Sequence, residues 1–219
     1  MRTTQSTLLG LLLPRQSISR HLVDVTVLAP IKALGRSVPS ANLVDGRLPD
    51  SSFFTNRPIS ELSPEHVRRG PTLPGQEPQP PFVVTRMKVE GKTAGFFAKD
   101  AKGDRYLLKL DHPDYPGLLT GTEVATSKLL HALGYYVPSY EIVEFPPEQL
   151  IVSEHAEIDR EAFDRILASR VRDGRVRVCA SRLLEGEILG PFRFQDYRHL
   201  TELRALRVGY AWVNNTDGK

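Results

Sequence analysis

The alternation of apolar and polar positions changes character near Pro81. Over residues 1–80 prolines recur without a helical or strand-like period, and "PGQEPQPP" at residues 74–81 cannot form a regular ladder because proline lacks a backbone N–H. We therefore predict an irregular, proline-rich N-terminal extension over 1–80. Inside it, the adjacent Phe53 and Phe54 indicate docking onto another surface or, as the plainer alternative, a loop anchored by two aromatic rings.

Beyond Pro81 the pattern predicts three consecutive strands. The first, "FVVTRMKVE" at 82–90, is rich in β-branched residues with partial alternation, and "FFAKD" and "RYLLKLD" follow at 96–100 and 105–111. Two glycine-containing turns, "GKTAG" at 91–95 and "AKGD" at 101–104, separate them. Strands joined by such short turns predict a three-stranded meander.

A helix is expected next. Thr120 or Thr122 can cap its N-terminus, apolar residues then approximate one face as far as Leu133, and Gly134 is well placed as the C-terminal stop. The stretch "YYVPSYEIVEF" at 135–145 then predicts a fourth strand region, in which the proline marks a bulge or an edge.

The remaining sequence alternates between charged and apolar patterns. Residues 147–173 are charged and we expect them to be helical, as in "DREAFDRILASRV". Residues 174–184 predict a fifth strand with clean alternation at Val176, Val178 and Ala180. Residues 197–213 have helical spacing of apolar positions, and this helix leads to the polar sequence "NNTDGK".

Composition narrows the class of protein only moderately. The 219 residues include 29 Lys plus Arg and 26 Asp plus Glu, and a net charge of +3 gives no reason to expect nucleic acid. The single cysteine, Cys179, excludes an internal disulfide and a cysteine-built metal site. No segment approaches the roughly 20 apolar residues of a transmembrane helix. We expect a cytoplasmic protein; the short apolar stretch from Leu8 to Leu13 keeps a signal peptide, and a secreted or periplasmic location, as the alternative.

Two residues in this order of elements suggest chemistry. The order is similar to that of the small lobe of a protein-kinase-like fold and the start of its large lobe, in which a strand lysine holds nucleotide phosphates and a helix glutamate pairs with it. Lys109 lies mid-strand in "YLLKLD", and Glu123 lies early in the following helix. Taken singly, Lys109 could be an exposed lysine on an open sheet face, and Glu123 a solvated helix residue.

The turn between the first two strands occupies the place of a phosphate-covering loop. Its backbone amides, with Gly91, Lys92, Thr93 and Gly95, could contact phosphate. The stretch lacks a G-x-G-x-x-G pattern, so a plain hairpin turn is the alternative. Residues 183–186 would form the hinge beside an adenine pocket.

Asp217 is the candidate catalytic residue. It follows the last predicted helix, where an aspartate could orient or deprotonate an attacking hydroxyl group; a polar turn is the alternative. The six histidines have no ligand spacing, and no nucleophile motif of a hydrolase is present.

Several stretches together resemble a known family. They are "GRLPDSSFFTNR", "TAGFFAKDAKGDRYLLKLDHPDYPGLLTGTEVATSKLLHALGYYVPSYEIVEF", "ASRLLEGEILGPF" and "LRALRVGYAWVNNTDGK". They look like a family of large, mostly uncharacterised bacterial proteins with a protein-kinase-like fold, which is distantly similar to the HipA-type and phosphoinositide-kinase-like kinases. The resemblance covers residues 48–219.

The resemblance implies a fold, a ligand and a set of roles. The fold would be α+β: a kinase-like small lobe at 81–190, with an antiparallel sheet of about five strands and one main helix, and the start of a large lobe at 191–219. Lys109 would bind the phosphates of ATP, Glu123 would pair with it, and Asp217 would be the catalytic aspartate. The family continues further, with a metal-binding acidic residue, so we expect a fragment without metal ligands of its own for Mg²⁺. Its missing C-terminal lobe would be a partner.

Three functions therefore stay open. The first is the N-terminal part of an ATP-dependent phosphotransferase, inactive by itself, whose partners are a nucleotide and an unidentified phospho-acceptor. The second is a kinase-fold binding or scaffold module without transfer activity. The third is a secreted or envelope-associated protein that shares only the fold.

Overall fold

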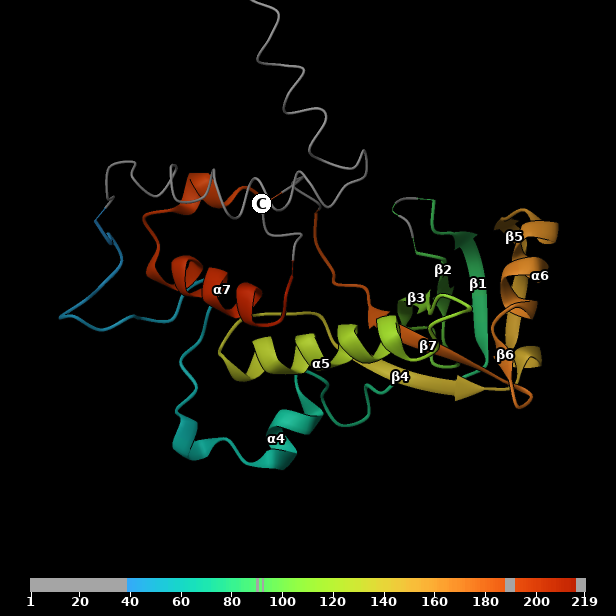
Figure 1. Ribbon diagram of the computed structural model, residues 1–219, viewed down its shortest axis with the longest axis horizontal. Coiled ribbons are helices and arrows are strands. Elements are labelled where there is room, and N and C mark those ends of the chain that lie inside the picture. The colour runs from blue at the N-terminus through green and yellow to red at the C-terminus, as the bar shows by residue number, and fades with distance from the viewer. Residues whose placement is uncertain (1–38, 90, 92, 188–191, 216–219) are drawn as a thin grey trace, which may run out of the picture. The chain divides into compact units, whose positions relative to one another are not determined.

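The computed structural model describes residues 39–89, 91, 93–187 and 192–215. The chain divides into two compact units, Met1–Ala41 and Asn42–Lys219, and every element named below belongs to the second. The described residues of this unit form a seven-stranded mixed sheet and four α-helices (Figure 1). The predicted α+β class is therefore confirmed. The apolar stretch from Leu8 to Leu13 lies outside the described residues.

The sheet extends the predicted meander at both edges. Its strands run in the spatial order β4–β7–β3–β2–β1–β5, and β6 pairs with β7. All neighbours are antiparallel except β1 and β5, which are parallel. The strands are β1 (Phe82–Met87), β2 (Gly95–Lys99), β3 (Arg105–Leu110), β4 (Tyr140–Phe145), β5 (Leu150–Glu157), β6 (Val171–Arg172) and β7 (Arg175–Arg182).

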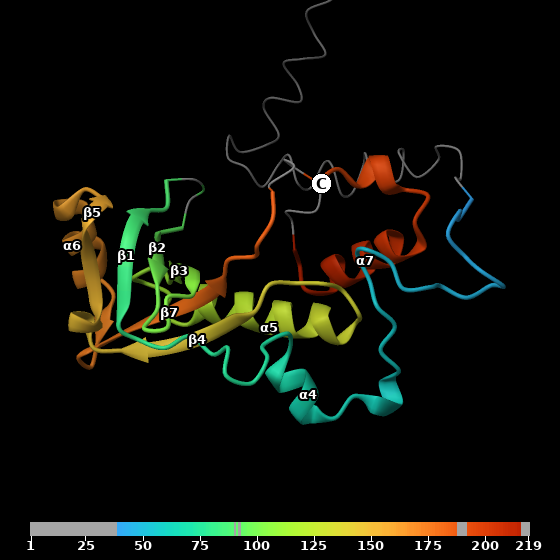
Figure 2. The same ribbon diagram turned by 180° about the vertical axis from the view of Figure 1, so that it is seen from behind.

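The helices cover different parts of this sheet. They are α4 (Pro64–Arg69), α5 (Leu118–Ala132), α6 (Arg160–Ala168) and α7 (Thr201–Trp212), with 3-10 turns at Ile59–Glu61, Pro147–Gln149 and Phe194–Tyr197. Helix α5 contacts β3, β4 and β7. Figures 1 and 2 show α5 between α4 and α7, while α6 lies at the other end of this unit beside β5.

The main core lies on the sheet face that α6 covers. Val176, Val178 and Ala180 of β7 are all buried, as predicted, but Cys179 and Ser181 are buried too, so burial alternates only at the start of this strand. Phe96 of β2 packs against Phe163 of α6 with ring centroids 4.9 Å apart. Burying a side chain of this size contributes about 1.5–3 kcal/mol, so these contacts hold the sheet and α6 together.

The prediction of a helix over 147–173 is only half right. Residues 160–168 form α6, whose N-cap Asp159 accepts a hydrogen bond from the Ala162 backbone. Residues 150–157 instead form strand β5, which pairs in parallel with β1. Leu150 is buried in the core, and the β-branched Ile151 and Val152 suit a strand. The predicted purely antiparallel sheet of about five strands is wrong for the same reason.

Helix α5 begins differently from the prediction. Neither Thr120 nor Thr122 is its N-cap; the helix starts at Leu118, after Gly117 in a left-handed conformation. The carboxylate of Asp111 accepts hydrogen bonds from the backbone N–H groups of Gly117 and Thr120 and from the Thr120 hydroxyl group. An acidic side chain outside the helix thus satisfies its first amides.

The C-terminal end of α5 agrees with the sequence. Gly134 follows the C-cap residue with φ +104°, and its N–H donates to the His131 carbonyl. A Cβ atom at Gly134 would lie 2.4 Å from the Phe54 ring and 2.5 Å from the Thr55 carbonyl oxygen. Glycine is therefore required both by the backbone conformation and by the close approach of the N-terminal extension.

The extension docks through its two adjacent phenylalanines. The rings of Phe54 and Tyr135 lie 5.6 Å apart, and those of Phe53 and Tyr197 lie 5.4 Å apart. These contacts join a second core between α5 and α7 that contains Leu130. Both aromatic side chains thus dock on this unit itself. No helix of the described ranges is long and apolar enough to span a membrane.

Candidate functional site

The candidate site lies on the sheet face that contacts α5. Strand register sets this face, because side chains alternate along each strand. Two cross-strand rows carry it: Gly95, Lys109, Cys179 and Ile142 in one, and Phe97, Leu107, Ser181 and Tyr140 in the other.

Lys109 forms the ion pair that the sequence predicts. Its Nζ lies 2.7 Å from Oε1 of Glu123 in α5. The two side chains keep only 16% and 26% of their exposure. Lys109 is thus not an exposed lysine on an open sheet face, and Glu123 is not a fully solvated helix residue.

The surroundings keep Lys109 charged. Burial by itself lowers the pKa of Lys109, but the hydrogen bond that Lys109 donates to Glu123, with the electrostatic effects of Tyr140 and Glu123, outweighs it, so the pKa lies above its usual value. The Tyr140 ring also presents its π-system to the ammonium, with Nζ 5.4 Å from the ring centroid. The group therefore remains a cation at neutral pH.

Three contacts fix the position of Glu123 relative to the sheet. Asp111 holds the first turn of α5. The Ser127 hydroxyl group donates to the Pro138 carbonyl oxygen, and Lys128 pairs with Glu141 of β4 at 3.0 Å. These contacts lie before and after Glu123 along the chain, so they fix the position of α5 on the sheet. The Glu123 carboxylate is therefore held close to Lys109.

The turn between β1 and β2 contains a second lysine that sequence reasoning missed. Nζ of Lys88 lies 3.0 Å from the Thr93 carbonyl oxygen and 3.1 Å from its hydroxyl group. No carboxylate pairs with Lys88 in the described part of the chain. The predicted Gly91 and Thr93 belong to this turn, and Lys92 lies outside the described residues.

The reason Lys88 was missed is a local irregularity. The register of β1 shifts between Val84 and Arg86, which moves all later side chains relative to simple alternation. The only signal in the sequence was the partial rather than strict alternation of "FVVTRMKVE".

Gly95 allows the β1–β2 turn to lie close to β3, the strand that contains Lys109. It pairs with Lys109 across β2 and β3, and a Cβ atom here would lie 2.7 Å from the Leu108 carbonyl oxygen. Any larger residue would push the strands apart. Gly95 and Lys109, both predicted site residues, are therefore brought together by the fold.

Two further predicted features are less defined. Residues 183–186, the predicted hinge, follow β7 and bend at Glu185 and Gly186; the Leu183 N–H donates to the Arg105 carbonyl oxygen, and Leu184 is 68% exposed. The predicted catalytic Asp217 lies outside the described residues.

The Cys179 thiol on this face is not activated as a nucleophile. Burial, followed by the Glu123 charge, raises the pKa of the Cys179 thiol to about 12, so it is not a nucleophile at neutral pH. In the described ranges, no group of three or more His, Cys, Asp or Glu side chains could hold a metal ion.

Comparison of the chain with protein-family models, with curated proteins and with solved structures found no match.

Proposed function

We propose that residues 81–215 bind ATP in the manner of the small lobe of a kinase-like phosphotransferase. The observation that carries the proposal is the 2.7 Å ion pair between Lys109 of β3 and Glu123 of α5. In protein kinases a lysine on the third strand must pair with a glutamate of the next helix before the phosphates are held correctly. Here the pairing residues lie on the third strand and the following helix as well.

The polar groups of the site suit phosphate. The Lys109 ammonium is oriented by Glu123 yet keeps some exposure, so an anion can approach it. Lys88 supplies a second ammonium, whose partners among the described residues are neutral oxygens of Thr93. A phosphate chain would exchange those neutral contacts for charge-assisted hydrogen bonds, which are stronger.

The apolar groups of the same face suit a nucleobase. Leu107 precedes Lys109 by two residues, so it lies on the same face of β3, and it is half-buried. Phe97 of β2 is its cross-strand partner. Residues 183–186 would offer backbone hydrogen bonds at the edge of this surface, as predicted for a hinge.

The proposal assigns ATP with Mg²⁺ as the cofactor. Magnesium, when bound, neutralises charge on the transferring phosphoryl group. We assign Lys109 and Lys88 to the phosphates, Glu123 to positioning Lys109, and Asp217 to the attacking hydroxyl group of the phospho-acceptor. A cytoplasmic location belongs to the same proposal, since ATP is available there.

Nucleotide titration of the full chain tests this proposal. Isothermal titration calorimetry with Mg-ATP, Mg-ADP and AMP should show binding that strengthens with the number of phosphates. Equal affinity for the three nucleotides would remove the phosphates from the interaction and contradict the proposal. Incorporation of labelled phosphate into the chain or an added acceptor would show transfer in addition to binding.

A further inference from the structure

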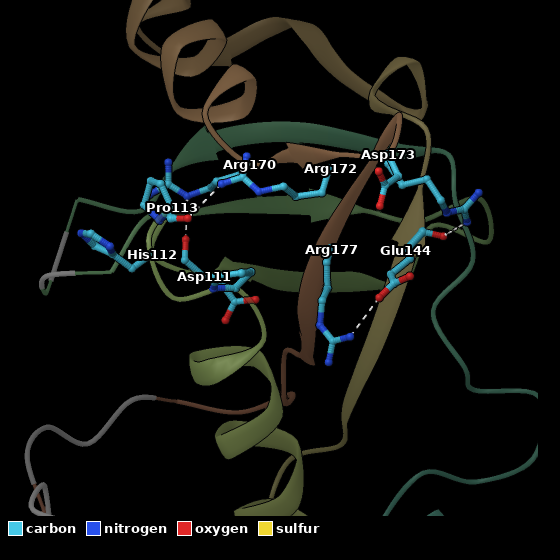
Figure 3. A pocket seen from close by; sticks show the side chains of 10 residues that line it. Asp111, His112, Pro113, Glu144, Arg170, Arg172, Asp173 and Arg177 are labelled. Carbon is cyan, nitrogen blue, oxygen red and sulfur yellow. Dashed lines mark hydrogen bonds and ion pairs between the residues drawn. The ribbon is translucent and has the colours of Figure 1, made fainter.

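A second group of cations surrounds a hollow that the nucleotide proposal does not use. The hollow has a volume of about 250 Å³ and lies where β6, β7 and the end of β4 approach the segment before α5. We call it the arginine hollow; it is lined by Asp111, His112, Pro113, Pro116, Glu144, Arg170, Arg172, Asp173, Arg175 and Arg177. Figure 3 shows Arg170 and Arg172 along its upper edge, with Arg177 and Glu144 below.

Three of the four arginines are held by backbone oxygens. Arg170 donates to the Asp111 and Ile166 carbonyl oxygens, Arg172 donates to that of Pro113, and Arg175 donates to that of Glu144. None of these three guanidinium groups forms an ion pair with a carboxylate of the described residues. Neutral partners fix their positions without cancelling their charge.

The carboxylates of the hollow are mostly engaged elsewhere. Asp111 accepts from the first amides of α5. Glu144 pairs with Arg177 at 2.9 Å, which neutralises the fourth arginine. Asp173, in the β6–β7 turn, is the third carboxylate. Four guanidinium groups against three carboxylates leave the hollow with a net charge of +1.

We propose that the arginine hollow binds a phosphate group, either inorganic phosphate or the phosphate of a monoester. The net positive charge attracts an anion, and three guanidinium groups without a carboxylate partner among the described residues can contact its oxygens. Guanidinium groups present planar pairs of N–H donors that suit phosphate oxygens. The volume is below the range of about 300–1,000 Å³ that is usual for drug-sized ligands, so a small anionic group is the fitting occupant.

This site is separate from the one at Lys109, yet it touches the same helix. Nε of Arg177 donates to the Thr120 hydroxyl group, 3.0 Å away in the first turn of α5. Arg170 contacts the backbone of Asp111, whose side chain caps that turn. An anion in the hollow would therefore connect β6 and β7 to the N-terminal end of α5.

Calorimetric titration with inorganic phosphate and, separately, with phenyl phosphate tests the proposal. The double variant Arg172→Gln/Arg175→Gln should bind at least about tenfold more weakly than wild type, because each removed guanidinium costs a charge-assisted hydrogen bond. Both side chains are exposed, so the variant should fold normally. Arg160→Gln/Arg165→Gln, which removes two exposed arginines of α6, is the matched control and should bind as wild type does.

The remaining outcomes are decisive as well. Binding of either phosphate compound that persists in Lys109→Ala and weakens in Arg172→Gln/Arg175→Gln supports the site, and the better compound identifies free or esterified phosphate as its source. Absence of binding of both compounds by the wild type at millimolar concentration would overturn the proposal. Equal weakening by the α6 control would overturn it too, since the effect would then come from net charge alone.

Discussion

Nζ of Lys109 and Oε1 of Glu123 lie 2.7 Å apart, although their residues belong to a strand and a helix. A second pair in the same region, Lys128 with Glu141, has a 3.0 Å separation and nearly the same exposure. The two ion pairs thus resemble each other in distance and exposure but not in position. Only Lys109 of the first pair lies beside Gly95, the first residue of the strand that follows the β1–β2 turn. This contrast provides internal controls for several experiments.

Replacement of Glu123 should lower both the stability of the fold and the pKa of Lys109. In Glu123→Gln the burial that lowers the pKa of Lys109 is no longer outweighed by the carboxylate, so this pKa falls. We expect a loss of about 1–3 kcal/mol in the free energy of unfolding at pH 7, between the values for exposed and for buried pairs. Urea denaturation at pH 7 measures it.

The pH dependence of this loss has a definite sign. Because the folded state raises the pKa of Lys109, the ion pair contributes fully below the unfolded value near 10.5 and is lost as pH rises through the folded value. The difference between wild type and Glu123→Gln should therefore shrink above pH 10.5. A difference that grows in alkali would contradict the ion pair. Glu141→Gln should cost similar stability but leave nucleotide affinity unchanged.

Lys88 should contribute to phosphate binding in proportion to the phosphate chain. We expect Lys88→Met to weaken Mg-ATP binding by about 3–10-fold, the loss of one partly exposed charge-assisted contact. AMP affinity should change much less, because a single phosphate reaches fewer of the cations. Lys99→Met, which removes an exposed lysine from the end of β2, is the control. If Lys88→Met lowered the affinities for ATP and AMP equally, Lys88 would not be a contact of the phosphate chain.

Gly134 should tolerate alanine far less well than other glycines with positive φ. Gly134→Ala places a methyl group against the Phe54 ring and the Thr55 carbonyl oxygen. Gly103→Ala, at φ +86°, meets no atom within 4 Å and bears only the backbone cost of about 1–2 kcal/mol. Denaturation midpoints should therefore fall further for Gly134→Ala. Similar midpoints would show that the extension does not dock on α5.

His131 should make the protein less stable in mild acid. Burial, followed by the charges of Arg57 and Arg69, lowers the pKa of His131 to about 4. The unfolded chain binds a proton near pH 6.5 while the folded chain stays neutral, so stability declines from pH 6.5 to 4. We expect a loss of about 1–2 kcal/mol after solvent screening. His131→Asn should flatten this decline, whereas His155→Asn should not.

The sequence predicts those features that rest on local pattern. Alternation located the strands around Lys109 and the fifth strand at 174–184, and the position of Gly134 located the end of α5. Strand β5 was missed because Ile151 and Val152 are followed by polar residues, and only its pairing with β1 defines it. The cap at Asp111 was missed because this side chain reaches across the loop that precedes α5.

Some residues of the candidate site are likewise predictable from local pattern, and others are not. Lys109 and Glu123 are predictable because strand and helix order suffices to suggest them. The engagement of Lys88 depends on a register shift in β1, and the arginine hollow depends on four arginines meeting near the start of α5. Such convergence depends on tertiary packing and leaves no short-range pattern in the sequence.

The most direct test of the account is the Mg-ATP affinity of three proteins: wild type, Lys109→Ala and Lys128→Ala. Both variants remove one partner of a partly buried Lys–Glu pair, so their stabilities should fall by similar amounts. If Lys109 holds phosphate, Lys109→Ala should weaken Mg-ATP binding by at least about tenfold, while Lys128→Ala should bind as wild type does. Equal affinity of Lys109→Ala and wild type would contradict the central claim.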